Sequence, residues 1–162
     1  MNSVEKMVNN YVTHYNHKKY WSWKEKLTNK KIPKFFRYFY LFRMRKMEAY
    51  NGASLGNQVN GGSCFKSPPF LPHGIKGIFI TDTASIGMNC TIFHQVTIGI
   101  KDWNGKGGPT IGDNVFIGAG AKIIGPVHMG DNVKIGANAV VVSDVPNNTT
   151  VVCQKARIIE KV

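Results

Sequence analysis

Histidine and cysteine are the residues of this chain with the clearest potential for chemistry. The 162 residues include three cysteines and five histidines, namely Cys64, Cys90, Cys153, His14, His17, His73, His94 and His128. A neutral imidazole can take a proton from a hydroxyl or bind a metal ion near pH 7. The cysteines are odd in number and lack the paired spacing of a metal site, so we expect small buried thiols in a reducing compartment and no bound metal.

Two parts of the chain that differ in charge must position these residues. Residues 1–48 hold twelve Lys and Arg against three Glu, a net charge of +9, whereas residues 49–162 hold nine against six acids, a net charge of +3. We therefore expect a basic, aromatic-rich segment over residues 1–50 and a nearly neutral domain over residues 51–162. No recognition helix or base-stacking motif accompanies the charge, so we expect no nucleic-acid binding.

Helical periodicity predicts two helices in the basic segment, over residues 3–28 and 33–50. We expect His14 and His17, in the first helix, to face solvent. The second helix begins at Pro33, which suits a first turn. Its basic flanks comprise Arg37, Arg43, Arg45 and Lys46. Its wide apolar face comprises Phe35, Phe36, Phe39, Tyr40, Phe42, Met44 and Met47. This face can pack against another subunit or lie on an anionic membrane surface. Both interpretations stay open here.

A six-residue repeat predicts the fold of residues 51–162. With one gap of thirteen, an aliphatic residue recurs every sixth position, at Ile80, Ile86, Ile92, Ile98, Ile111, Ile117, Ile123, Met129, Ile135 and Val141. A small apolar residue follows four places later, at Ala84, Cys90, Val96, Val115, Ala121, Val127, Val133, Ala139 and Val145. The short strands of a parallel β-helix satisfy this spacing, whereas helices and continuous strands do not. We expect an all-β solenoid of a little over three coils, capped by looser units over residues 55–60 and 75–79.

An inserted loop over residues 99–110 interrupts the repeat. Its sequence, GIKDWNGKGGPT, is polar and rich in glycine apart from Trp103. A solenoid that keeps its register and then inserts one loop usually does so for function. Trp103 has two interpretations, as an anchor on a neighbouring subunit or as a platform for a sugar ring or another acceptor.

The repeat from Ile111 to Val145, IGDNVFIGAGAKIIGPVHMGDNVKIGANAVVVSDV, resembles the hexapeptide-repeat acyltransferases, in their serine acetyltransferase-like branch. The resemblance covers residues 55–162 and includes LPHGIKGIFI, IFHQVTIG and KARII. It implies a left-handed parallel β-helix, an exception to the usual right-handed crossover. It also implies an enzyme that moves an acetyl group from acetyl-CoA to a hydroxyl, as a homotrimer or a dimer of trimers with active sites between neighbouring prisms.

By this resemblance, His73 in LPHGIKGIFI corresponds to the catalytic histidine. An imidazole is suited to take the proton of an acceptor hydroxyl, whose oxygen then attacks the thioester directly. No cysteine is placed to form an acyl-enzyme. His94 stands where the family often has Gln or His, and three roles remain open for it: it assists catalysis, holds substrate or bonds a carbonyl.

The resemblance also indicates where the coenzyme binds. His94, Ala119 and Ala137 occupy the same position of the repeat in consecutive coils, two residues after an aliphatic residue. We therefore expect these three residues to stack in a column. In the family, such alanines admit the pantetheine arm. The other residues that we expect at the coenzyme are Gly99, Ile100, Gly118 and Lys134 beside the groove, and Lys155 and Arg157 at the phosphates.

Two departures from the serine acetyltransferase pattern concern the acceptor. Pro72 replaces the Asp that precedes the catalytic histidine, and residues 107–109 replace an Arg-His pair with Gly-Gly-Pro. Because a small charged acceptor loses its best anchor without a cation, we predict a saccharide acceptor. The residues that we expect to contact the acceptor are Trp103, Asp102 and Asp82, and the two aspartates are also candidates to orient His73.

Several alternatives accompany this prediction. The acceptor could be serine, in cysteine biosynthesis, or an antibiotic, and a non-catalytic scaffold would leave His73 without a task. A β-helix carbonic anhydrase needs two histidines five residues apart, whereas His73, His94 and His128 are 21 and 34 residues apart. We expect the protein in the cytoplasm, either free or peripheral at the inner face of the membrane.

Overall fold

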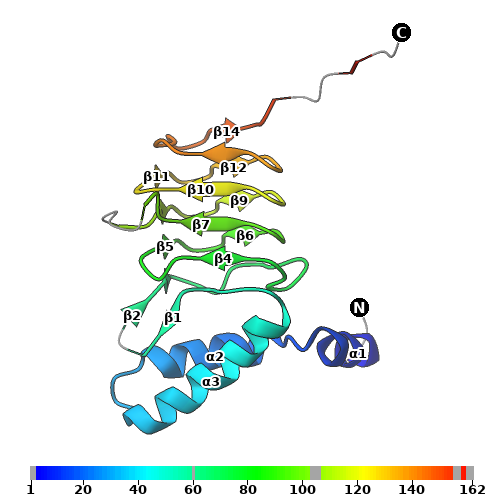
Figure 1. Cartoon of the computed structure of the whole chain (residues 1–162), viewed down its shortest axis with the longest axis vertical. Coiled ribbons are helices and arrows are strands. Elements are labelled where there is room, and N and C mark those ends of the chain that lie inside the picture. Colours follow the sequence, from blue (N-terminus) through cyan, green and yellow to red (C-terminus); the bar gives the residue numbers. More distant parts are fainter. Residues whose placement is uncertain (1–2, 60, 103–106, 155–157, 160–162) are drawn as a thin grey trace.

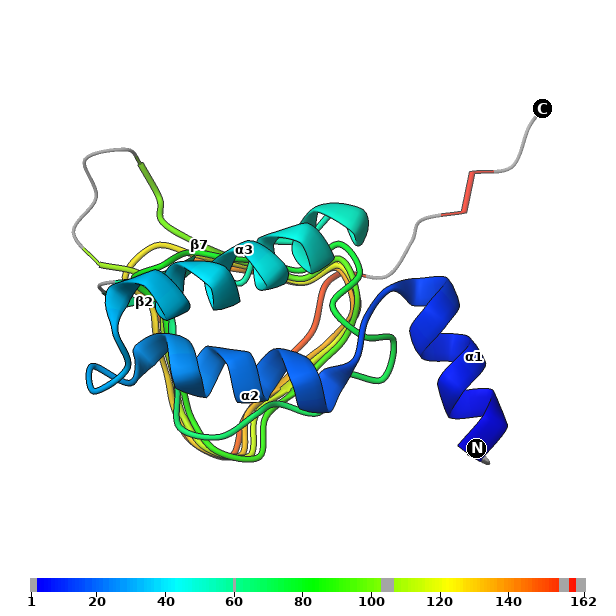
Figure 2. The ribbon, with the colours of Figure 1, turned by 90° about the horizontal axis from the view of Figure 1, so that it is seen from below.

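The computed structural model describes residues 3–59, 61–102, 107–154 and 158–159. Three helices form one end of the molecule, and a three-sided parallel β-helix rises from them (Figure 1). The helices are α1 (Ser3–Thr13), α2 (His17–Thr28) and α3 (Lys34–Tyr50). Helices α2 and α3 lie across the lower opening of the β-helix, whereas α1 projects from one side (Figure 2).

The predicted single helix over residues 3–28 is wrong, because the chain turns between α1 and α2. His14 adopts a left-handed backbone conformation with φ of 49°. Asn16 is the N-cap of α2, and its side chain accepts a hydrogen bond from the Lys19 N–H. This bond stabilises a new helix start, because it satisfies an N–H that has no acceptor within the helix. The predicted second helix is confirmed as α3.

Each face of the β-helix is a parallel sheet of very short strands. The first face holds β4 (Phe79–Ile80), β7 (Thr97–Gly99), β10 (Lys122–Ile124) and β13 (Val140–Val141). The second face holds β3 (Cys64–Phe65), β5 (Ser85–Ile86), β8 (Thr110–Ile111) and β11 (His128–Met129). The third face holds β6 (Thr91–Ile92), β9 (Phe116–Ile117), β12 (Lys134–Ile135) and β14 (Thr150–Val151). An antiparallel hairpin of β1 (Asn57–Gln58) and β2 (Gly61–Gly62) stands where we expected a looser hexapeptide.

Register and burial confirm the predicted repeat. On the first face, Ile98 pairs with Ile80 below and Ile123 above, and every leading and every following position of the repeat is buried. These side chains stack into one continuous apolar core. The chain turns left-handed around this core (Figure 2). Cys90 is buried there, but Cys64 and Cys153 are exposed. The expectation of three buried thiols is wrong, because those two lie at the ends of the solenoid.

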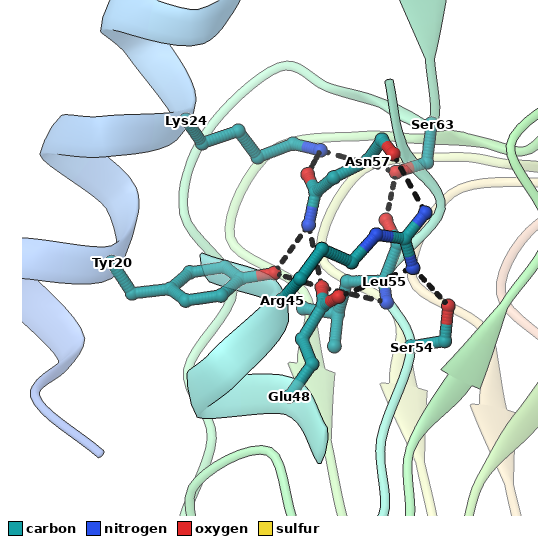
Figure 3. Close-up of polar contacts among 8 residues, drawn as sticks. All are labelled: Tyr20, Lys24, Arg45, Glu48, Ser54, Leu55, Asn57 and Ser63. Carbon is teal, nitrogen blue, oxygen red and sulfur yellow. Dashed lines mark hydrogen bonds and ion pairs between the residues drawn. The ribbon is translucent and has the colours of Figure 1, made fainter. Parts of the chain in front are cut away.

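A buried polar cluster fastens α2 and α3 to the first turn of the β-helix (Figure 3). The Glu48 Oε1 accepts hydrogen bonds from the Tyr20 hydroxyl and the Asn57 Nδ2, both at 2.6 Å. The Lys24 Nζ donates to the Asn57 Oδ1 at 2.6 Å and to the Ser63 Oγ at 3.2 Å. Because Lys24 and Glu48 are both buried, hydrogen-bond partners replace the water that each charge loses.

The apolar face predicted for the second helix is divided in α3 between the protein surface and the core. Met44 is buried, but four phenylalanines of the predicted face are exposed: Phe35, Phe36, Phe39 and Phe42. Arg37, predicted on a flank, is buried instead. Its Nε donates to the Leu27 carbonyl oxygen at 2.7 Å, and its Nη2 donates to the Val59 carbonyl oxygen. These bonds turn the Arg37 side of α3 toward the core, so the phenylalanines face outward.

Candidate active site

Small residues stack where the third face passes into the first, a corner that we call the histidine corner. The register of β6, β9 and β12 places His94, Ala119 and Ala137 one above another. The Gly120 N–H donates to the His94 carbonyl oxygen at 3.0 Å, and the Asn138 N–H donates to the Ala119 carbonyl oxygen at 2.9 Å. The stack that the repeat phase predicts is therefore present.

His73 lies on a loop, residues 71–77, that enters β4 at the same corner. Ile75 is fully buried and anchors this loop in the core. Gly74 has φ of +66° and lies against the Tyr15 ring, where an added Cβ would come within 3.0 Å of the Cδ1 atom. Glycine adopts this conformation without steric cost. Tyr15, between α1 and α2, thus supports the loop that presents the exposed His73 side chain.

The two histidines predicted to be catalytic meet at this corner. The ring centroids of His73 and His94 are 4.9 Å apart, and the ring planes are nearly perpendicular, at 88°. Phe93 also contacts His73, with ring centroids 5.7 Å apart. The His94 Nδ1 is buried and has no hydrogen-bond partner among the described residues. One coil of the solenoid brings together two imidazoles that are far apart in the sequence.

A cavity of about 640 Å³ opens beside His73, toward the N-terminal residues. Besides His73 and Tyr15, the polar side chains that line it are Asn10, Thr13, His17, Asn51 and Lys76. This set offers hydrogen bonds to an acceptor that carries hydroxyl groups.

The prediction that His17 faces solvent is wrong. Its ring is half-buried in the wall of this cavity, and the Tyr15 hydroxyl lies 3.0 Å from its Nδ1. Burial lowers the pKa of His17, so its neutral form dominates at pH 7. Sequence reasoning missed this residue because it lies outside the repeat, and only the turn between α1 and α2 directs it toward His73. His14 and His128 are exposed.

Several predicted site residues lie instead where the first face passes into the second, which we call the loop corner. Asp82 accepts a hydrogen bond from the Gln58 Nε2 there, and Asp102 is exposed on the inserted loop. Gly99 and Ile100 lie at the same end of the first face. One face of the prism separates them from His73, and Figure 2 shows the inserted loop on the side opposite α1. The hypothesis that Asp82 or Asp102 orients His73 within one chain is therefore wrong.

The other predicted coenzyme residues lie near the column. Gly118 is buried beside Ala137, where an added Cβ would approach the Ala137 backbone nitrogen to 2.7 Å. Lys134 is exposed on β12, three residues before Ala137. Trp103, Lys155 and Arg157 lie outside the described residues. Within the described part of the chain, no group of three or more His, Cys, Asp or Glu is placed to hold a metal ion.

Comparisons with known proteins agree with this architecture. The family model described as bacterial transferase hexapeptide (six repeats) matches residues 108–143. The serine acetyltransferase of Helicobacter pylori is 42% identical over 107 residues, which cover 65% of this chain and 62% of that protein. Serine acetyltransferase isoform 3 of Entamoeba histolytica, solved in complex with cysteine, matches with a TM-score of 0.64 and 33% identity, over 76% of this chain and 43% of that one. The chain is thus similar in sequence and in fold to hexapeptide-repeat acyltransferases.

Another solved relative is the soybean serine acetyltransferase complexed with serine. It matches with a TM-score of 0.63 and 33% identity, over 76% of this chain and 49% of that chain. This chain thus spans less than two thirds of the length of these relatives. The left-handed β-helix and the serine acetyltransferase-like branch, both predicted from the sequence, are confirmed.

The two departures from the serine acetyltransferase pattern are also present in three dimensions. Pro72 offers no carboxylate beside His73. An added Cβ at Gly108 would lie 2.6 Å from the Thr81 Cγ2 and 2.7 Å from the Thr83 Oγ1. The base of the inserted loop therefore packs directly on the loop corner, with no room for a cationic side chain at position 108.

Proposed function

We propose that the protein is an acetyl-CoA-dependent O-acetyltransferase with His73 as its general base. One observation carries the proposal: the His73 and His94 rings lie 4.9 Å apart at the column of small residues. Ala119 and Ala137 leave that column open to the pantetheine arm, and the polar cavity beside His73 offers a place for the acceptor. Relatives named serine acetyltransferase support the same activity.

In the proposed reaction, the His73 imidazole accepts the proton of the acceptor hydroxyl while the oxygen attacks the thioester carbonyl carbon. The tetrahedral intermediate then collapses, the carbon–sulfur bond breaks, and the imidazolium returns the proton to the coenzyme thiolate. The products are the acetyl ester and free coenzyme A. Burial raises the pKa of the Cys90 thiol, which disfavours its thiolate, so this cysteine is unsuited to carry the acetyl group.

L-Serine is the acceptor that the comparisons favour over the saccharide predicted from the sequence. The relatives reported above are named serine acetyltransferase, and the soybean structure contains serine. A saccharide stays the second candidate, because Pro72 and residues 107–109 lack the carboxylate and cation that would hold an amino acid.

We further propose a homotrimer, alone or paired, in the cytoplasm. Gly99, Ile100 and Asp102 lie one face away from His73 in the same chain. In the trimer, the loop corner of one subunit faces the histidine corner of the next, so these residues complete the neighbour's site. Light scattering tests this assembly, and a monomer that turns over acetyl-CoA at full rate would contradict it.

The activity is tested by following thiol release from acetyl-CoA with L-serine and with a panel of sugars. Wild-type protein should release thiol, and His73→Ala should reduce kcat by about 10² to 10⁴-fold, the usual contribution of a general base. His128→Ala is the matched control, since that histidine is exposed on β11.

Two outcomes of this assay would change the assignment. Turnover of a sugar but not of serine selects the second acceptor. Failure to bind acetyl-CoA at all would favour the non-catalytic scaffold, and full activity of His73→Ala would refute the general-base role.

A further inference from the structure

An aromatic stripe faces away from the body of the protein along α3. Phe35 is 78% exposed, Phe39 is 52% exposed and Phe42 is 65% exposed. Their spacing of four and three residues places them on one side of the helix. The buried residues Met44 and Glu48 lie on the opposite side, against α2 and the first turn of the β-helix. Nothing in the described part of this chain covers the stripe.

The helices that carry and support this stripe are strongly basic. Over residues 17–50, one carboxylate, Glu25, is exposed. Over the same residues nine cations are exposed: Lys18, Lys19, Lys26, Lys30, Lys31, Lys34, Arg43, Arg45 and Lys46. We call the stripe and these cations the aromatic cap surface. It forms the end of the molecule opposite the last coils (Figure 1).

The polar cluster and Arg37 keep the stripe exposed. Burying the phenylalanines on this chain would require α3 to roll, which would break the Arg37 bonds to two carbonyl groups and the Glu48 bonds to Tyr20 and Asn57. Each buried group would then lose a hydrogen-bond partner, and this cost opposes the roll. The outward aromatic face is therefore built into the packing of the cap.

The charge decides which occupant fits this surface. A second copy would bring two sets of nine exposed cations face to face, and like charges repel. An anionic lipid surface instead attracts the cations through its phosphates and accepts the phenylalanine rings at the boundary of the acyl chains. Among the described residues, no helix is long and apolar enough to cross a membrane, so the contact would be peripheral.

We propose that the aromatic cap surface docks this protein on an anionic lipid bilayer. The docked orientation lays α3 parallel to the membrane, with Phe35, Phe39 and Phe42 inserted among the lipids. The histidine corner lies in the coils next to the cap, so the site stays close to the bilayer and open to the aqueous side. Because the inference rests on the cap alone, it is independent of the proposed reaction.

Vesicle co-sedimentation of the full chain tests this proposal. The two vesicle types are phosphatidylcholine alone and phosphatidylcholine with about one third phosphatidylglycerol. Wild-type protein should pellet with the anionic vesicles only, and less at high salt. The affinity of the triple variant Phe35→Ser, Phe39→Ser, Phe42→Ser for these vesicles should be at least about tenfold lower, because the variant lacks three rings that the lipid would bury. The double variant Val142→Ser, Val152→Ser is the matched control, because both valines are exposed at the far end.

Three results would overturn the inference. They are the absence of wild-type binding to anionic vesicles, equal binding by the triple phenylalanine variant, and a fall in oligomer mass of that variant in solution. The last result would show that the surface joins copies of this chain. Circular dichroism confirms that each variant is folded, as the exposure of every substituted side chain leads us to expect.

Discussion

At the scale of single residues, His73 owes its position to three neighbours. Gly74 lets the loop turn, Tyr15 supports it from below, and His94 meets the His73 ring almost at a right angle. The Nδ1 of His94 is buried without a partner in the described residues. The half-buried His94 imidazole is well placed to hold His73, the proposed general base, in one orientation.

Replacement of His94 by Ala should lower kcat by about 10²-fold, because a shift of about 1 Å in a catalytic group has an effect of that size. The KM for acetyl-CoA should change little. His94→Phe keeps a ring against His73 and separates the roles that the sequence left open. Recovery of activity in His94→Phe supports positioning, whereas an equal loss indicates a hydrogen bond or a proton transfer. Wild-type activity in His94→Ala would show that His94 has no part in the reaction.

At the scale of elements, the coils align the groove that we propose for the coenzyme. Ala119 and Ala137 contribute no functional group, and their importance lies in the space that they leave at the histidine corner. The parallel register between β9 and β12 sets this alignment. Gly118 makes the close approach of the two coils feasible, because any side chain there would collide with the Ala137 backbone.

Ala137→Tyr should raise the KM for acetyl-CoA about tenfold or more, which corresponds to about 1.4 kcal/mol of lost binding. Ala137 is exposed, so the larger side chain should fill the groove without lowering the melting temperature. Ala49→Tyr, at an exposed position of α3, is the control. An unchanged KM in Ala137→Tyr, measured alongside this control, would place the coenzyme elsewhere.

At the scale of the whole molecule, one buried cluster joins the helical cap to the β-helix. Lys24, Glu48 and Asn57 come from α2, α3 and β1, and each bonds to groups from another element (Figure 3). Burial lowers the pKa of Lys24 to about 8 from its ordinary value of 10.5. Between these two pH values the unfolded chain binds more protons at Lys24 than the folded protein does.

The free energy of unfolding should therefore depend on pH through Lys24. Its contribution to stability should increase as pH rises from about 8 toward 10, with a slope approaching about 1.4 kcal/mol per pH unit. Urea unfolding of wild type and Lys24→Met across this range measures the effect. Tyr20 and Cys90 also titrate but are present in both proteins, so their effects largely cancel in the difference. Parallel stability curves for the two proteins would contradict the prediction.

The sequence predicted well wherever its signal is local and periodic. Each hexapeptide places one aliphatic side chain inward whatever the other coils do, so Ile80 through Val141 revealed the solenoid and the phase of His94, Ala119 and Ala137. The cap was harder to predict, because its phenylalanines look like core residues. No local pattern shows that Arg37 and Glu48 have buried partners on other elements.

The sequence alone determined the repeat, because it depends on residue spacing along one chain, and the family resemblance singled out the two histidines as candidates. The tertiary structure decided that His73 and His94 meet, that His17 joins the cavity wall, and that Asp82 and Asp102 lie at another corner. It also decided which side of α3 faces outward. These outcomes depend on contacts between distant segments, whose free energies compete with one another and leave no periodic trace in the sequence.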